Sequence, residues 1–344
     1  MHPALVPIVD RRAPAGPDQW DALWQALADG ALDRGDALAL LASLTAALPE
    51  GDGLLALLDA LDRRRPARPA TPWPDTVNVV GTGGGPPTVN LSTASALVAA
   101  SCGVRVVKSG SRAHTARTGS VDLLDRLGVP FAASLDQASA QLDAHGIAFT
   151  GPFVYPAQLA RLALLAVPTP MRVFGRFLNT VGPFLAALPV AAQVTGVSGG
   201  ELPPALRAVA ARPGAPRTWL VTNPAGADEL LSMCDNTVHL PDGTTLTLRA
   251  GDLVPADGTL KDLAPVAREE AADHFRGVLT GRTGGPLRAT LQLNAAALAL
   301  ASGHRDDWAK AVAEAGAALD DGAALGLLER LASARRKEAG HGAG

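Results

Sequence analysis

Three polar segments of the sequence, each following a short apolar run, have residue types that suit phosphate and a divalent cation. The first is glycine-rich and extends from Gly81 to Thr93. Glycines let a backbone approach an anion closely, and free N–H groups at a helix start point toward it. The segment therefore predicts a phosphate-binding loop, with a plain strand-to-helix turn capped by Ser or Thr as the alternative. It contains neither the P-loop nor the G-x-G-x-x-G fingerprint.

The second polar segment, residues 108–120, is basic and rich in hydroxyl groups. Lys108 directly follows the apolar run Val104–Val107, in a chain whose other lysines are at 261, 310 and 337. Ser109, Ser111 and Ser120 add hydroxyl groups, the last of them as a helix cap. In an α/β sheet both loops would leave the carboxyl ends of strands, where ligands bind. We therefore expect a second anion-binding loop here, with a solvated basic loop as the alternative.

The third segment contains adjacent carboxylates, Asp228 and Glu229, shortly after the apolar run Leu220–Val221. Mg²⁺ prefers carboxylate oxygens, water and substrate phosphate as ligands. Because Asp-Glu pairs are also common on protein surfaces, this pair indicates a metal site only in combination with the two loops.

Composition restricts the class of protein. The 344 residues are 47% hydrophobic and 18% charged, which is typical of a globular chain of about two domains or one large one. A net charge of −3 without a long basic run argues against nucleic acid as the main partner. Cys102 and Cys234 form no C-x-x-C motif, and neither a signal peptide nor an apolar run of about 18 residues is present. We expect a cytoplasmic protein without a membrane partner.

The elements that must position these segments follow from periodicity. Apolar residues recur at helical spacing within 19–63, and prolines at 66, 69, 72 and 74 predict a linker. Strand–loop–helix alternation from Thr76 onward predicts an α/β domain with a mainly parallel central sheet flanked by helices. The expected strands lie at 77–80, 104–107, 149, 153–154, 219–221 and 237–240, and helices at 91–101, 120–127 and within 285–336. The expected organisation is a helical domain (1–66, with part of about 170–190 packing on it), a linker (67–74), an α/β domain (75–337) and a disordered tail (338–344).

In their order and spacing, from about residue 20 to about residue 336, these segments resemble the anthranilate phosphoribosyltransferases, within the wider group that includes the pyrimidine nucleoside phosphorylases. Val80–Ser95 resembles that family's G-T-G-G-D…N-I-S-T-A-S segment, and Lys108–Gly128 resembles its K-H-G-N-R…G-S-A-D-x-L-E-x-L-G segment. Four further family motifs follow in the expected order, at Gly182-Pro183, Gly196-Val197, Asp228-Glu229 and Asn294–Ala296.

The resemblance implies a small N-terminal helical domain beside a large α/β domain, a homodimer formed through the helical domain, and transfer from 5-phosphoribosyl 1-diphosphate (PRPP) to a small aromatic acceptor with Mg²⁺ as cofactor. Lys108 and Asn90 would be catalytic, and Ser92, Asp228 and Glu229 would hold the metal. The implied donor contacts are Gly81, Thr82, Gly83, Gly84, Thr88, Asn90, Leu91, Ser92, Thr93, Lys108 and Ser120. The implied acceptor contacts are Gly81, Ser109, Ser111, Tyr155 and Ala166.

Departures from the family pattern concentrate on the acceptor side. Ser109 stands where the family has His, Ser111 where it has Asn, and Tyr155 where it has the His of His-Pro-Ala. The family's arginine pair, of which one member should face the carboxylate of anthranilate, falls at Leu165-Ala166. Loss of that arginine would leave a buried carboxylate unpaired, at a cost on the order of several kcal/mol. We therefore expect a different aromatic or heteroaromatic acceptor, unless Arg161 or Arg172 substitutes from nearby.

The donor side departs at one point, where the Asp that follows G-T-G-G is replaced by Gly85 and then by Pro86-Pro87. Two alternatives to the transferase remain. A nucleoside phosphorylase is suggested by Lys108–Arg112, although the loop at Gly81 lacks the Lys-x-Ser-Thr-Gly-Gly start of that group. A catalytically silent binding paralogue would be permitted by the altered acceptor residues.

Overall fold

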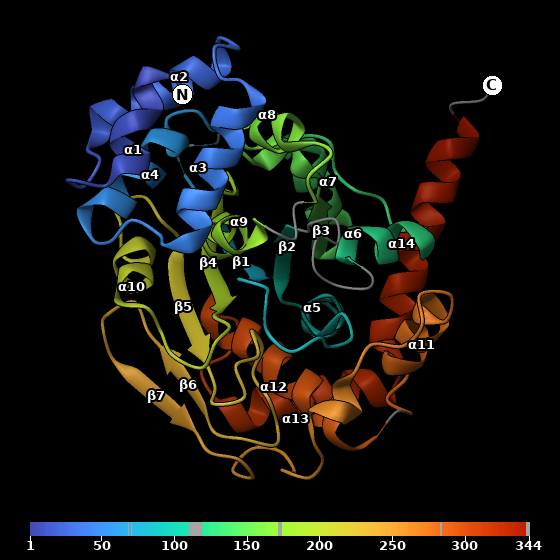
Figure 1. Cartoon of the computed structure of the whole chain (residues 1–344). Helices are drawn as coiled ribbons and strands as arrows, with labels where there is room; N and C mark the ends of the chain where they lie inside the picture. The colour runs from blue at the N-terminus through green and yellow to red at the C-terminus, as the bar shows by residue number, and fades with distance from the viewer. Residues whose placement is uncertain (68, 70, 110–118, 171–173, 283, 342–344) are drawn as a thin grey trace. The chain divides into compact units, whose positions relative to one another are not determined.

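A computed structural model describes residues 1–341 except 68, 70, 110–118, 171–173 and 283 (Figure 1). The chain divides into two compact units. The helical unit comprises Met1–Arg68, Phe153–Leu188 and Leu202–Ala215, and the sheet unit comprises Pro69–Pro152, Pro189–Glu201 and Pro216–Gly344. The helical unit thus takes more of the central chain than the stretch at about 170–190 that the sequence assigned to it.

The helical unit is built from amphipathic helices whose apolar residues recur at helical spacing. Within α2, Trp20, Leu23, Trp24 and Leu27 lie on one buried face. Helix α8 packs against α2 and α3, and Thr45 of α3 donates a hydrogen bond to the carbonyl of Phe174 at 3.1 Å. The helices of this unit are α1 (Val6–Asp10), α2 (Pro17–Ala28), α3 (Arg34–Ala46), α4 (Asp52–Asp62), α8 (Ala157–Ala166), α9 (Gly175–Val181) and α10 (Pro204–Ala210).

In the part of the chain that the structure describes, the sheet unit contains seven strands in the order β3-β2-β1-β4-β5-β6-β7. Strands β1 to β5 are parallel, and β6 and β7 are antiparallel additions at one edge. The strands are β1 (Trp73–Gly81), β2 (Arg105–Ser109), β3 (Ile147–Thr150), β4 (Val190–Gly196), β5 (Arg217–Thr222), β6 (Asn236–His239) and β7 (Thr245–Leu248). The chain order reverses between β1 and β4, and ligands bind at such a switch point, outside the carboxyl ends of the strands. The prediction of a mainly parallel α/β sheet with a helical domain is confirmed.

Four details of the predicted elements are wrong. Strand β4 was not predicted because Val190–Gly196 contains alanines and a glutamine among its β-branched residues, and β7 was also missed. Residues 153–154 belong to a 3-10 turn, Pro152–Val154, because Pro152 cannot donate to a ladder. Strand β1 begins at Trp73, inside the expected linker, and the register shift between Trp73 and Val77 accommodates Pro74.

The two faces of the sheet differ in polarity. Val77, Val79 and Val106 belong to the main apolar core, which α5 (Leu91–Ser101) and α12 (Gly285–Ser302) cover (Figure 1). On the alternate positions, the buried Asn78 donates to Gln193 Oε1 at 3.0 Å across β1 and β4. The Gln193 Nε2 atom donates in turn to Thr195 Oγ1 at 2.9 Å, so the two buried amides have hydrogen-bond partners, as buried amides require.

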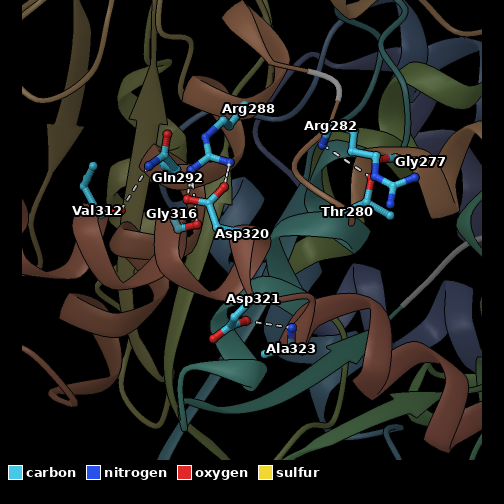
Figure 2. Close-up of polar contacts among 10 residues, drawn as sticks. All are labelled: Gly277, Thr280, Arg282, Arg288, Gln292, Val312, Gly316, Asp320, Asp321 and Ala323. Carbon is cyan, nitrogen blue, oxygen red and sulfur yellow. Dashed lines mark hydrogen bonds and ion pairs between the residues drawn. The ribbon is translucent and has the colours of Figure 1, made fainter.

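Of the C-terminal helices, the one at 308–320 packs on α12 and α5, and the one at 323–341 packs on α5. Arg288 of α12 forms a two-bond ion pair with Asp320, at 2.6 and 2.8 Å, and donates to the Gly316 carbonyl at 3.2 Å (Figure 2). These contacts join α12 to α13 (Trp308–Asp320). Helix α14 (Ala323–His341) includes 338–341 of the expected tail, and 342–344 lie outside the described residues. The other helices of the unit are α6 (Ser120–Arg126), α7 (Leu135–His145), α11 (Ala271–Val278) and the 3-10 helix η5 (Leu260–Leu263). Within the described ranges, none of the helices has the length and apolar character to cross a membrane.

Candidate active site

The glycine-rich loop connects the end of β1 to the start of α5. Gly83 and Gly84 have φ angles of +63° and +82°, a left-handed conformation that favours glycine. The Thr82 N–H donates to the Gly196 carbonyl at 2.9 Å, which fixes the loop to the end of β4. The loop therefore leaves the sheet at its switch point, where ligands bind.

Ser198 holds this loop from the segment that follows β4. Its hydroxyl donates to the Gly83 carbonyl at 2.7 Å, and its N–H donates to Thr82 Oγ1 at 3.0 Å. Sequence reasoning missed Ser198 because β4 was not recognised, although the run Ser198–Gly200 after an apolar segment was an available signal.

Asp228 also contacts the glycine-rich loop. Its Oδ2 atom accepts a hydrogen bond from the Gly83 N–H at 2.8 Å. A Cβ atom at Gly81 would lie 2.0 Å from Asp228 Oδ2, and one at Gly196 would lie 1.7 Å from the Asp228 carbonyl oxygen. Glycine is therefore a steric requirement at both positions.

The departure at Gly85 has a steric reason of the same kind. A Cβ atom at this position would lie 2.7 Å from the carbonyl oxygen of Gly226 and 3.4 Å from Cα of Ala227. The loop in this chain approaches the segment before Asp228 more closely than any side chain at position 85 would permit.

Lys108 lies at the end of β2 and is buried, with 4% of its surface exposed. Its ammonium donates to the Val79 carbonyl at 3.2 Å and to Ser92 Oγ at 3.3 Å. Burial lowers the pKa of Lys108 to about 8, against the opposing effect of the carboxylates of Glu229 and Asp228. The lysine that the sequence singled out thus joins β2 to the first turn of α5, within electrostatic reach of the two carboxylates.

Glu229 has an unsatisfied oxygen next to a second carboxylate. Its Oε1 accepts a hydrogen bond from Thr88 Oγ1 at 3.5 Å, and Oε2 is buried with no partner among the residues the structure describes. Burial, followed by the charge of Asp228, raises the pKa of Glu229 well above its usual value.

These groups fit a divalent cation. Among the residues with described positions, Asp228 and Glu229 are not joined by a third His, Cys, Asp or Glu that could complete a metal cluster. Mg²⁺ typically takes one or two carboxylates and fills its remaining positions with water and phosphate oxygens. Ser92 Oγ, held by Lys108, is a further oxygen that the sequence assigned to the metal.

The remaining predicted donor residues differ in accessibility. Asn90 is the N-cap of α5, and its side chain makes no capping hydrogen bond. Leu91 and Thr93 have fully buried side chains, and their backbone N–H groups donate to the carbonyls of Val89 and Asn90. Their roles in donor binding stay predictions. Ser120 is the first residue of α6 and not its cap, since Gly119 occupies the cap position. A role for Ser120 in donor binding stays a prediction.

The predicted acceptor residues are divided between the units. Ser109 ends β2, and its N–H donates to Asn78 Oδ1 at 3.3 Å. Ser111 lies outside the described residues, as does Arg172. Tyr155 and the fully buried Ala166 belong to the helical unit. Arg161 of the same unit donates to the Ala28 carbonyl. The assembly of these residues into one acceptor pocket stays a prediction.

Comparison with known proteins agrees with this geometry. Residues 73–325 match the family model described as "Glycosyl transferase family, a/b domain". The chain belongs to this family of glycosyl transferases. It is 37% identical over 279 residues to anthranilate phosphoribosyltransferase 2 of Streptomyces coelicolor, covering 77% of this chain and 80% of that protein. It is 33% identical over 310 residues to the anthranilate phosphoribosyltransferase of Methylobacterium nodulans, covering 89% and 90%.

Solved structures show the same fold. Anthranilate phosphoribosyltransferase of Thermus thermophilus has a TM-score of 0.77 and 29% identity, covering 97% of this chain and 100% of that one. The Saccharomyces cerevisiae enzyme in complex with PRPP and Mg has a TM-score of 0.72 at 22% identity, covering 93% and 92%, and shows the fold alone. The chain is therefore a pentosyltransferase related to the anthranilate phosphoribosyltransferases, as the resemblance implied. The general reaction of these relatives is phosphoribosyl transfer.

Proposed function

We propose that this protein transfers the 5-phosphoribosyl group of PRPP to an aromatic or heteroaromatic acceptor other than anthranilate, with Mg²⁺ and with release of diphosphate. The observation that supports binding of PRPP is the buried Lys108 ammonium, 3.3 Å from Ser92 Oγ and within electrostatic reach of Asp228 and Glu229. A cation fixed beside two carboxylates suits a metal-bound diphosphate.

The chemistry needs charge stabilisation more than a nucleophile. Cleavage of the bond between ribose and diphosphate leaves an oxocarbenium-like centre and a strongly anionic leaving group. Lys108 would hold the leaving diphosphate, and Asn90 would orient the donor. The Thr82 and Gly83 N–H groups would instead keep the loop in place, since they donate to the Gly196 carbonyl and to Asp228 Oδ2. Asp228, Glu229 and Ser92 would hold Mg²⁺, which supplies further positive charge when bound. The acceptor is then held for attack by positioning.

The proposal that the acceptor is not anthranilate depends on the absence of the family's arginine pair. Leu165 and Ala166 occupy those positions, and Ala166 is fully buried, so neither offers a cation to a carboxylate. A neutral or differently charged aromatic ring avoids leaving a buried carboxylate unpaired.

A screen for diphosphate release tests both halves. Aromatic amines, phenols and azoles, with anthranilate among them, are offered with PRPP and Mg²⁺, and uridine with phosphate tests the phosphorylase alternative. We expect release with an acceptor other than anthranilate. Efficient turnover of anthranilate at micromolar concentration would contradict the acceptor half, and absence of magnesium-dependent PRPP binding in calorimetry would contradict the donor half. Leu165→Arg, which restores one cation, is expected to improve use of anthranilate.

The proposal includes a cytoplasmic homodimer formed through the helical unit. Among its described residues, that unit exposes four large apolar side chains, at Met1, Val6, Leu164 and Val167. The proposal assigns these side chains to the association surface, which a contiguous apolar patch, and not a single exposed side chain, would mark. Light scattering measures the mass in solution, and a monomer at micromolar concentration would contradict this part.

A further inference from the structure

Asn223, which directly follows β5, bridges the two sides of Asp228. Its Nδ2 donates to the carbonyl of Ala227 at 3.0 Å and to the carbonyl of Glu229 at 2.8 Å, while its Oδ1 accepts the Ala227 N–H at 3.2 Å. The side chain is 2% exposed. One buried amide therefore fixes the backbone immediately before and after the first carboxylate.

Asn294 of α12 fixes the residue after the second carboxylate. Its Oδ1 accepts the Leu230 N–H at 3.1 Å, and its Nδ2 donates to the Leu230 carbonyl at 2.8 Å. The same Nδ2 donates to the Thr290 carbonyl at 2.8 Å, which anchors the amide to its own helix. Asn223 and Asn294 reach the loop from different elements, far apart in the sequence.

The two amides act on a loop that is already closely packed. The Asp228 backbone lies against Gly196, where a Cβ atom would come within 1.7 Å of the Asp228 carbonyl oxygen. The peptide groups of Ala227, Glu229 and Leu230 are held by the asparagines, so the carboxylates project from a backbone with little freedom. Groups that orient metal ligands in this way change metal affinity by about 10- to 100-fold when they are removed.

We propose that Asn223 and Asn294 are positioning residues that hold Asp228 and Glu229 at the separation a divalent cation requires. This inference rests on the proposed function, because it assumes that the two carboxylates bind the metal of the reaction. Without the amides, the backbone that carries the two side chains would gain freedom, and the carboxyl groups would no longer be held in one arrangement for the cation.

Asn236 provides a matched control. It is 1% exposed, its Oδ1 accepts the Leu231 N–H at 2.8 Å, and its Nδ2 donates to the carbonyls of Leu231 at 2.8 Å and Cys234 at 3.0 Å. Like the other two asparagines, it is a buried amide that hydrogen-bonds to backbone groups. The backbone that it binds, however, begins at Leu231, one residue beyond Leu230. Its removal should cost similar stability without releasing the carboxylates.

The experiment is a Mn²⁺ titration of the full chain, followed by electron paramagnetic resonance, with and without inorganic diphosphate. We expect Asn223→Ala and Asn294→Ala to weaken Mn²⁺ binding about 10-fold or more, and Asn236→Ala to change it less than about 2-fold. Thermal melting below saturation with metal records the loss of stability in all three. If the alanine variants do not fold, Asn223→Ser and Asn294→Ser, which retain one donor, are compared by the same criteria.

Unchanged Mn²⁺ affinity in both variants would overturn the inference, as would an equal loss in Asn236→Ala. An unaltered chain that binds Mn²⁺ but no PRPP would contradict the proposed function and leave the inference standing when the variants differ. An unaltered chain that binds no Mn²⁺ under either condition would overturn both.

Discussion

Lys108 Nζ donates to Ser92 Oγ across 3.3 Å, although the two side chains come from the end of a strand and the first turn of a helix. The contact orients the serine hydroxyl, which the sequence assigned to metal binding, with the ammonium that it assigned to the donor. A second bond of the same ammonium, to the Val79 carbonyl at 3.2 Å, fixes it against β1. Donor and metal groups are therefore linked before any ligand arrives.

Donor binding should be accompanied by proton uptake above about pH 8. Burial lowers the pKa of Lys108 to about 8 in the free protein, and bound diphosphate would raise it again. The affinity for PRPP should then fall as the pH rises above 8, at most by about tenfold per pH unit. Calorimetry in buffers of different ionisation enthalpy measures the proton uptake. Lys108→Met should bind PRPP weakly and lose this pH dependence, and an unaltered slope in that variant would assign the proton elsewhere.

Metal binding should release a proton from Glu229. The pKa of Glu229 is raised well above its usual value by burial and by Asp228, so a cation must displace a proton. Mg²⁺ affinity should therefore rise with pH until the free protein is deprotonated, and Glu229→Gln should abolish both the binding and the release. Because the folded pKa is raised, the free energy of unfolding is highest below the unfolded pKa and falls as pH rises through the folded one. Urea unfolding without metal checks this sign, and a rise in stability over that range would contradict it.

Much of the fold could be predicted because many of its elements have local sequence patterns. The β-branched runs of β1 and β2 and the helical spacing of Trp20 to Leu27 in α2 are patterns of neighbouring residues. Strand β4 could not be predicted in this way, because its alanines and Gln193 are suited to a strand only between β1 and β5. Its place in the sheet depends on tertiary partners.

The site, like the fold, has features that the local sequence predicts and features that depend on tertiary contacts. The residue types of the loop at Gly81, of Lys108 and of the Asp228-Glu229 pair were visible in the sequence. The requirement for glycine at positions 81 and 196 was not visible in the sequence. It comes from close contact with Asp228, which is distant in the chain. Ser198 was missed for a related reason, since its partners Thr82 and Gly83 follow another strand.

Gly81→Ala should impair metal-dependent activity more than it impairs folding. The new Cβ would lie 2.0 Å from Asp228 Oδ2, so the carboxylate must rotate and give up the Gly83 N–H. The lost hydrogen bond should reduce the free energy of unfolding by about 1–3 kcal/mol. Steady-state kinetics against Mg²⁺ concentration measures the first effect and urea unfolding the second. An unchanged Mg²⁺ requirement would show that Asp228 does not hold the metal from its present position.

Gly196→Ala should be the more damaging change, because its obstacle is backbone. The Cβ would lie 1.7 Å from the Asp228 carbonyl oxygen and 2.3 Å from the carbonyl carbon, so the peptide itself must move away from β4. We expect a loss of more than about 3 kcal/mol in the free energy of unfolding, as for severe overpacking. Gly277→Ala is the control, since Gly277 lies in α11 and no atom outside its chain neighbours and the local helix backbone would lie within 4 Å of its Cβ. The free energy of unfolding of that variant should rise by about 0.5–1 kcal/mol, because alanine has a higher helix propensity than glycine. Equal stability of the two variants in urea unfolding would contradict the close approach of Asp228 to β4.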